Sequence, residues 1–128
     1  MRRLPSLLAL SILLVTTACA GSRQARPVSE SRDVILQHQI DAVGSRTVYE
    51  LVQRLHPLWL QKRGTNTIND EGDIVVYLDN ARLGGPETLR EIQAGNVASV
   101  RFFDAGRAQY RFGVGHMHGA IVVTTRSR

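Results

Sequence analysis

Three runs of β-branched and aromatic residues mark the C-terminal half of the chain. Residues 74–78 (Ile-Val-Val-Tyr-Leu) are rich in strand formers and run into Asp79 and Asn80, which tolerate the left-handed conformation of a turn. Residues 97–103 and 120–125 carry the same kind of run, and the second of these starts directly after Gly119. The pattern predicts three strands in this half.

The apolar spacing changes to that of helices between residues 34 and 56. Leu36, Ile40 and Val43 fall at i, i+4 and i+7, and Gly44 is placed to end this first helix. Thr47 and Glu50 have the spacing of a capping box, in which each side chain satisfies a backbone N–H at the start of a helix. The apolar face of this second helix consists of Val48, Leu51, Val52 and Leu55.

Proline and glycine set the remaining boundaries. Pro57 is expected to stop the second helix at His56, and residues 58–60 then read as the apolar start of another strand, with Trp59 packed in the core. Pro86 sits where a first helical residue tolerates a missing N–H, and Gly95 is placed to end a helix of about two turns. These elements predict an α+β domain with a small mixed sheet and two to three short helices.

A glycine-rich connection precedes the last predicted strand. Gly113, Gly115 and Gly119 mark positions where the backbone needs a positive φ or a close approach, and the whole segment from Asp104 to His118 reads as a loop.

The order of these pieces resembles the plug domain of TonB-dependent outer-membrane receptors, most closely the plugs of the SusC-like glycan importers. Residues 76–80 stand where those plugs have a hydrophobic strand and an aspartate turn, and residues 100–105 stand where they have a later strand. Gly113 and Gly119 keep the six-residue glycine spacing of the family, and residues 119–126 close the domain in the same way. The resemblance covers residues 34–126 and implies a plug-like fold and a partner in the envelope, such as a barrel or uptake protein.

The sequence departs from the family pattern in three ways. Asn80 replaces a turn glycine, Arg101 replaces an acidic residue, and one residue too many lies between Asp104 and Phe112. A receptor also surrounds its plug with about 22 strands, each of about 9 to 11 residues, so its barrel alone needs over ~200 residues. A chain of 128 residues is therefore expected to act without a barrel of its own.

The N-terminus has the layout of an export signal. Arg2 and Arg3 precede an apolar run over residues 7–15 and then small residues, and that run is too short to span a membrane. Cys19 is the sole cysteine and follows a segment that resembles a lipoprotein lipobox, which implies cleavage before Cys19 and its acylation. Residues 18–20 also fit an ordinary peptidase site with cleavage after Ala20.

These signals divide the chain into a signal peptide (1–18), a polar tether (19–32) and the plug-like domain (33–128). By resemblance to lipoprotein sorting, Ala20 after the cysteine points to the outer membrane, with the domain facing the periplasm. The tether contains Pro27 and several Ser and Arg residues and has a root-mean-square reach of ~20 Å.

Composition and charge narrow the range of functions. The formal charge of +5 falls by two when the signal peptide and its two arginines are removed, and the remaining basic residues are spread along the chain. Nucleic-acid sites instead show a clustered basic patch with interleaved aromatic residues, so no nucleic-acid partner is expected. Anionic lipid head groups remain a candidate partner.

Few side chains are candidates for metal binding or catalysis. His116 and His118 alternate in sequence, as two ligands on one face of an extended segment would, but no Cys, Asp or Glu nearby completes a metal site. The cluster of Asp70, Glu71 and Asp73 fits an acidic turn better than a calcium loop. The sequence predicts no catalytic residue, no metal and no cofactor.

The sequence favours a non-catalytic, monomeric outer-membrane lipoprotein that interacts with another envelope component. Two alternatives stay open: a periplasmic module that binds a small ligand or metal through the loop from Asp104 to His118, and a remnant of a receptor without a transport role.

Overall fold

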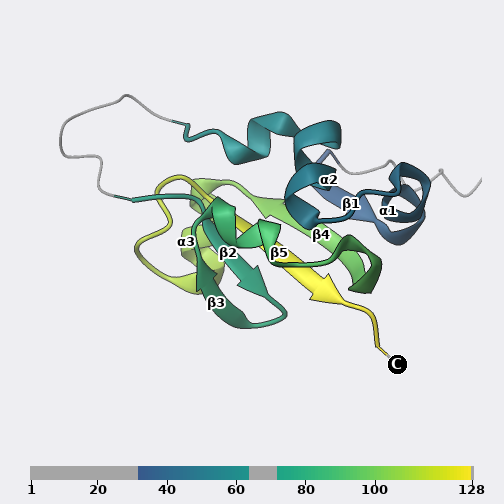
Figure 1. Cartoon of the computed structure of the whole chain (residues 1–128). Coiled ribbons are helices and arrows are strands. Elements are labelled where there is room, and N and C mark those ends of the chain that lie inside the picture. The colour runs from purple at the N-terminus through teal and green to yellow at the C-terminus, as the bar shows by residue number, and fades with distance from the viewer. Residues whose placement is uncertain (1–31, 64–71, 128) are drawn as a thin grey trace, which may run out of the picture.

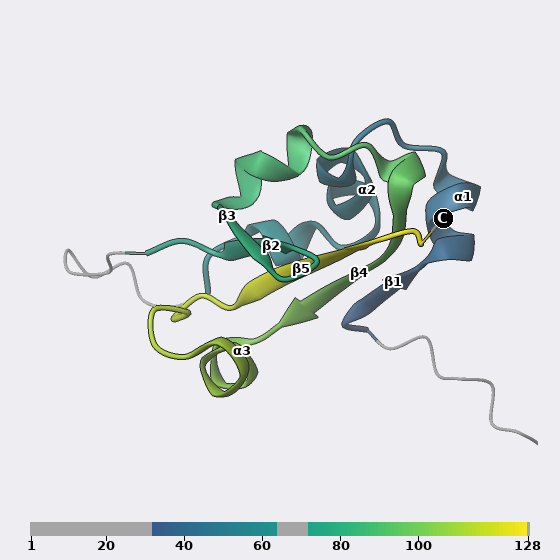
Figure 2. The ribbon, with the colours of Figure 1, turned by 90° about the horizontal axis from the view of Figure 1, so that it is seen from below.

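The computed structural model describes residues 32–63 and 72–127, and these form one mixed sheet with helices on both faces (Figures 1 and 2). The strand order is β1-β4-β5-β2-β3. β5 and β2 pair in parallel, and the other three neighbouring pairs are antiparallel. The strands are β1 (Val34–Leu36), β2 (Val75–Leu78), β3 (Ala81–Gly84), β4 (Val97–Phe103) and β5 (Ala120–Thr125). The predicted α+β class with a mixed sheet and short helices is confirmed.

One face of the sheet carries the larger core. α1 (Gln37–Val43), α2 (Val48–Leu55) and the 3-10 helices η1 (Pro57–Leu60) and η2 (Pro86–Arg90) cover this face. Alternate residues of a strand point to the same face of the sheet, and the helices contribute their apolar stripes. The buried core on this side includes Ile35, Val48, Leu51, Val52, Trp59, Val76, Leu89, Val100, Ile121 and Val123.

Among the described elements, α3 (Ala105–Phe112) is the helix on the opposite face, and it lies below the sheet in Figure 2. Its Ala108 packs with Val75, Tyr77 and Ala120 in a smaller core. The sequence predicted a loop here, and that prediction is wrong for residues 105–112. Asp104 caps the helix, because its carboxylate accepts the backbone N–H of Arg107 at 2.9 Å.

The predicted end of α1 and the predicted cap of α2 are present, with one difference in the capping box. Gly44 ends α1 with φ 62°, and its N–H donates to the carbonyl of Ile40. The hydroxyl of Thr47 accepts the N–H of Glu50 at 3.3 Å. The return contact of a capping box is displaced by one residue, since the Glu50 carboxylate accepts the N–H of Arg46 rather than that of Thr47.

Two predicted elements take a different form. Residues 58–60 do not start a strand but lie in η1, because Pro57 opens a new helical turn directly after α2. Trp59 is buried in the larger core, as predicted. The helix predicted after Pro86 is a 3-10 turn, η2, followed by the short η3 (Ala94–Asn96).

A tight turn joins β2 to β3. Asp79 adopts φ 55°, the left-handed conformation expected for this position. Its carboxylate accepts the backbone N–H and the hydroxyl of Thr125, each at 2.9 Å. The aspartate therefore links this turn to the end of β5.

The expected signal peptide, Cys19 and nearly all of the tether lie outside the described residues. Within residues 32–63 and 72–127, no helix has the length and apolar character needed to cross a bilayer.

Candidate functional site

The connection from α3 to β5 contains the glycines that the sequence singled out. Gly113, Gly115 and Gly119 have φ values of 89°, 94° and 93°. A Cβ on Gly119 would collide with the carbonyl oxygen of Phe103 and lie 3.2 Å from the ring of Phe102, whereas a Cβ on Gly113 would meet open space. Gly119 is therefore constrained by both conformation and packing, and Gly113 by conformation alone.

His116 is part of the smaller core and is only 2% exposed. Its Nδ1 lies 2.8 Å from the carbonyl oxygen of Gly113, so Nδ1 carries the proton and donates it. Nε2 then accepts the hydroxyl proton of Tyr77, also at 2.8 Å. One neutral tautomer satisfies both contacts, and the lone pair that a metal would need is already in use.

His118 holds two distant parts of the chain together. The ring is 4% exposed, and its Nδ1 lies 3.2 Å from the carbonyl oxygen of Arg63. A Cβ on Gly72 would lie 3.7 Å from the same ring. Lys62 adds a hydrogen bond from its ammonium group to the Gly72 carbonyl at 2.6 Å. His118 and Lys62 thus fix the residues on either side of segment 64–71.

The two histidines do not converge on a common ligand, because each contacts a different backbone carbonyl. In the described part of the chain, no three His, Cys, Asp or Glu side chains lie close enough to hold a metal ion. Asp70 and Glu71, the other acidic residues considered from the sequence, lie outside that part.

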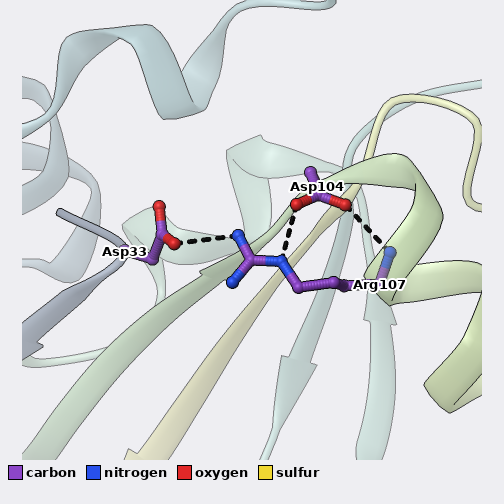
Figure 3. A network of polar contacts seen from close by, with 3 residues as sticks. All are labelled: Asp33, Asp104 and Arg107. Atoms are coloured by element: carbon purple, nitrogen blue, oxygen red, sulfur yellow. Dashed lines mark hydrogen bonds and ion pairs between the residues drawn. The ribbon is translucent and has the colours of Figure 1, made fainter. Parts of the chain in front are cut away.

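A charged network joins the start of β1 to α3 (Figure 3). The guanidinium of Arg107 donates to the carboxylate of Asp104 at 2.6 Å and to that of Asp33 at 2.8 Å. The Arg107 backbone N–H and guanidinium lower the pKa of Asp104, and the two carboxylates raise the pKa of Arg107. Sequence reasoning missed this network, although an aspartate is a preferred residue at the N-cap of a helix.

A groove of about 530 Å³ lies beside the start of β1. Its lining combines Leu55, His56, Leu58 and Trp59 with the charged side chains of Asp33 and Arg63. The ring of His56 stacks on that of Trp59 with centroids 4.2 Å apart, and Trp59 in turn stacks on Phe102. Burial lowers the pKa of His56, and the charge of Asp33 partly opposes this shift.

The face of the sheet that carries α3 is only partly covered. Arg101 and Arg111 lie beside Val122 and Thr124 around a hollow of about 140 Å³. A second, more apolar groove of about 400 Å³ runs between Phe103 and the side chains of Arg107, Tyr110 and Arg111. Both hollows present arginine and aromatic side chains to solvent.

No protein-family model matches this chain, and no curated protein matches its sequence at a significant level. The resemblance to receptor plugs stays a prediction.

Proposed function

We propose that this protein is a non-catalytic lipoprotein of the outer membrane, whose plug-like domain binds an integral outer-membrane barrel or uptake protein. The export signal, the lone cysteine at its end and the polar tether support the location. The order of strands and glycines, which is similar to that of receptor plugs, supports the class of partner.

The groove beside β1 is the observation that carries the proposal. It places the exposed side chain of Leu58 next to the stacked rings of His56 and Trp59, with Asp33 and Arg63 in the same lining. Protein interfaces are enriched in aromatic and arginine side chains, and a few of these carry most of the binding energy. The groove therefore has the composition of a protein-binding site.

The contacts of Arg107 and His116 favour a structural role for these two side chains. Arg107 engages the carboxylates of Asp33 and Asp104, and His116 uses both ring nitrogens within the smaller core. A general acid or base must instead reach a bound substrate. These side chains stabilise the fold, and the groove combines apolar surface with the charged side chains of Asp33 and Arg63.

Site-specific crosslinking in intact cells tests the proposal. A photoreactive benzoylphenylalanine at Leu58, which is 59% exposed on η1, should give an adduct with an integral outer-membrane protein. The matched control is the same side chain at Leu83, which is 42% exposed on β3 at the far edge of the sheet, and it should give none.

Two results would contradict the proposal. Equal adducts from both positions would indicate contact without a defined site. No adduct at Leu58, together with a rise in melting temperature on adding a small molecule, would favour a ligand-binding module instead.

A further inference from the structure

The outer side of α3 exposes large side chains that the fold does not use. Tyr110 is 95% exposed, and Val114, just past the end of the helix, is 94% exposed. Ala108 and Phe112 face the sheet, so Tyr110 points away from it. Arg111 lies between the two exposed residues in sequence. We refer to Tyr110, Arg111 and Val114 as the crest.

The arginine of the crest is held in place by aromatic rings. The guanidinium carbon of Arg111 lies 5.3 Å from the ring centre of Phe103 and 5.4 Å from that of Phe112. Arg101, on β4, lines the hollow of about 140 Å³ together with Arg111. Among the described residues, neither arginine has a carboxylate within ion-pair distance. The two nearby acids, Asp33 and Asp104, are both bound by Arg107.

The tether joins the domain beside this helix. The bond between Asp33 and Arg107 fixes the first described residues against α3, as Figure 3 shows. The tether sequence, residues 19–32, contains three arginines and one glutamate. An acyl chain at Cys19 would hold the domain at a root-mean-square distance of ~20 Å from the bilayer, with the crest close to the attachment point.

We propose that the crest is a second membrane contact, which lays α3 on an anionic bilayer surface. This inference rests on the proposed lipid anchor. Tyrosine and an aliphatic side chain insert at the boundary of head groups and acyl chains, and basic residues next to them attract anionic lipids. Such a contact is weak alone, but a lipid anchor makes it intramolecular and so raises its effective concentration.

The contact orients the domain. α2 and η1 lie on the face of the sheet opposite α3, as Figure 2 shows. A bilayer at the crest therefore leaves Leu58, which lies on η1, turned away from the lipid, where a protein can reach it.

Spin labels on the mature protein, purified from the envelope and placed on vesicles, test this orientation. The label replaces Tyr110 (Tyr110→Cys) or, as the matched control, Leu58 (Leu58→Cys), which is also an exposed apolar site. The measurement is the accessibility of each label to oxygen relative to a water-soluble nickel complex. When phosphatidylglycerol is added to phosphatidylcholine vesicles, this ratio should rise several-fold at position 110 and stay unchanged at position 58.

A second experiment removes the charges of Arg101 and Arg111. In the Tyr110→Cys protein, Arg101→Gln with Arg111→Gln should return the ratio at position 110 to its value on pure phosphatidylcholine. Equal ratios at positions 110 and 58 on the anionic vesicles would overturn the inference. So would a label at position 110 that is shielded before vesicles are added, because a second copy of the chain would then cover the crest.

Failure of the anchor is separable from failure of the crest. The mass of the purified protein shows whether an acyl chain is present. If it is absent, the anchor proposal is wrong, and the crest is tested by flotation of the unacylated protein with anionic vesicles. Flotation that is lost with Arg101→Gln and Arg111→Gln would support the contact, and no flotation would refute it.

Discussion

Replacement of Gly119 by alanine should destabilise the domain more than the same change at any glycine in open space. Gly119 has φ 93°, and strain of this kind costs an L-residue about 1–2 kcal/mol. The new methyl group would also press on the Phe103 carbonyl and the Phe102 ring, and overpacking of this kind costs about 1–3 kcal/mol. The expected loss is therefore about 2–5 kcal/mol, a large part of the ~5–15 kcal/mol that holds a small domain.

Two other glycines calibrate the measurement. Gly113 has φ 89° and ψ −170°, a region that is nearly specific to glycine, but its Cβ would meet nothing within 4 Å. Gly113→Ala should therefore cost only the strain, about 1–3 kcal/mol. Gly95 is exposed, has no positive φ and also faces open space, so Gly95→Ala should be neutral or stabilising by about 0.4–1 kcal/mol.

Urea denaturation of the three variants gives their order of stability. The expected order is Gly95→Ala, then Gly113→Ala, then Gly119→Ala as the least stable. A Gly119→Ala protein as stable as the Gly95→Ala protein would refute the geometry of the turn, and with it the strongest part of the plug resemblance.

Three further predictions address the histidines and the independence of the domain. Because burial lowers the folded-state pKa of His56, the unfolded chain binds a proton on this ring more readily than the folded domain does, and stability should fall as the pH drops below about 6.5. Urea titrations at pH 7.5 and 5.5 should show a smaller loss of stability for His56→Gln than for the wild type. An equal loss in the two proteins would refute the linkage. Zinc, copper or nickel should not raise the melting temperature of the wild type, and a stabilisation that is lost in the His116→Ala, His118→Ala double variant would show a metal site. Residues 33–128 should melt cooperatively by circular dichroism as a monomer, and a dye-binding species without a cooperative transition would show dependence on a partner.

The parts of the fold that the sequence predicted are those with long or sharply punctuated patterns. β4 and β5 have the predicted bounds because each is an uninterrupted run of strand formers. β1 was missed because it has three residues, and Leu36 at its end also fitted the helical spacing of Ile40 and Val43. A strand that short leaves no periodicity of its own to detect.

α3 was missed for a different reason. It buries one residue fully, Ala108, and Gly106 interrupts its first turn, so its sequence carries little apolar periodicity. Ala108 and Phe112 pack it against Val75, Tyr77 and Ala120 of the sheet, and Arg107 links it to Asp33, 74 residues earlier in the chain. His116 likewise reads as a polar loop residue until the fold places Tyr77 and Gly113 against its two ring nitrogens. Contacts between residues far apart in sequence decide both features, and no local pattern records them.

The intact mass of the mature protein, purified from the envelope, tests the proposed membrane anchor most directly. An N-terminus at Cys19 that carries the added mass of acyl chains is expected, and Cys19→Ser should then release the protein from the outer-membrane fraction. A mature chain that begins at Gly21 without lipid, or a Cys19→Ser protein that stays in that fraction, would contradict the account.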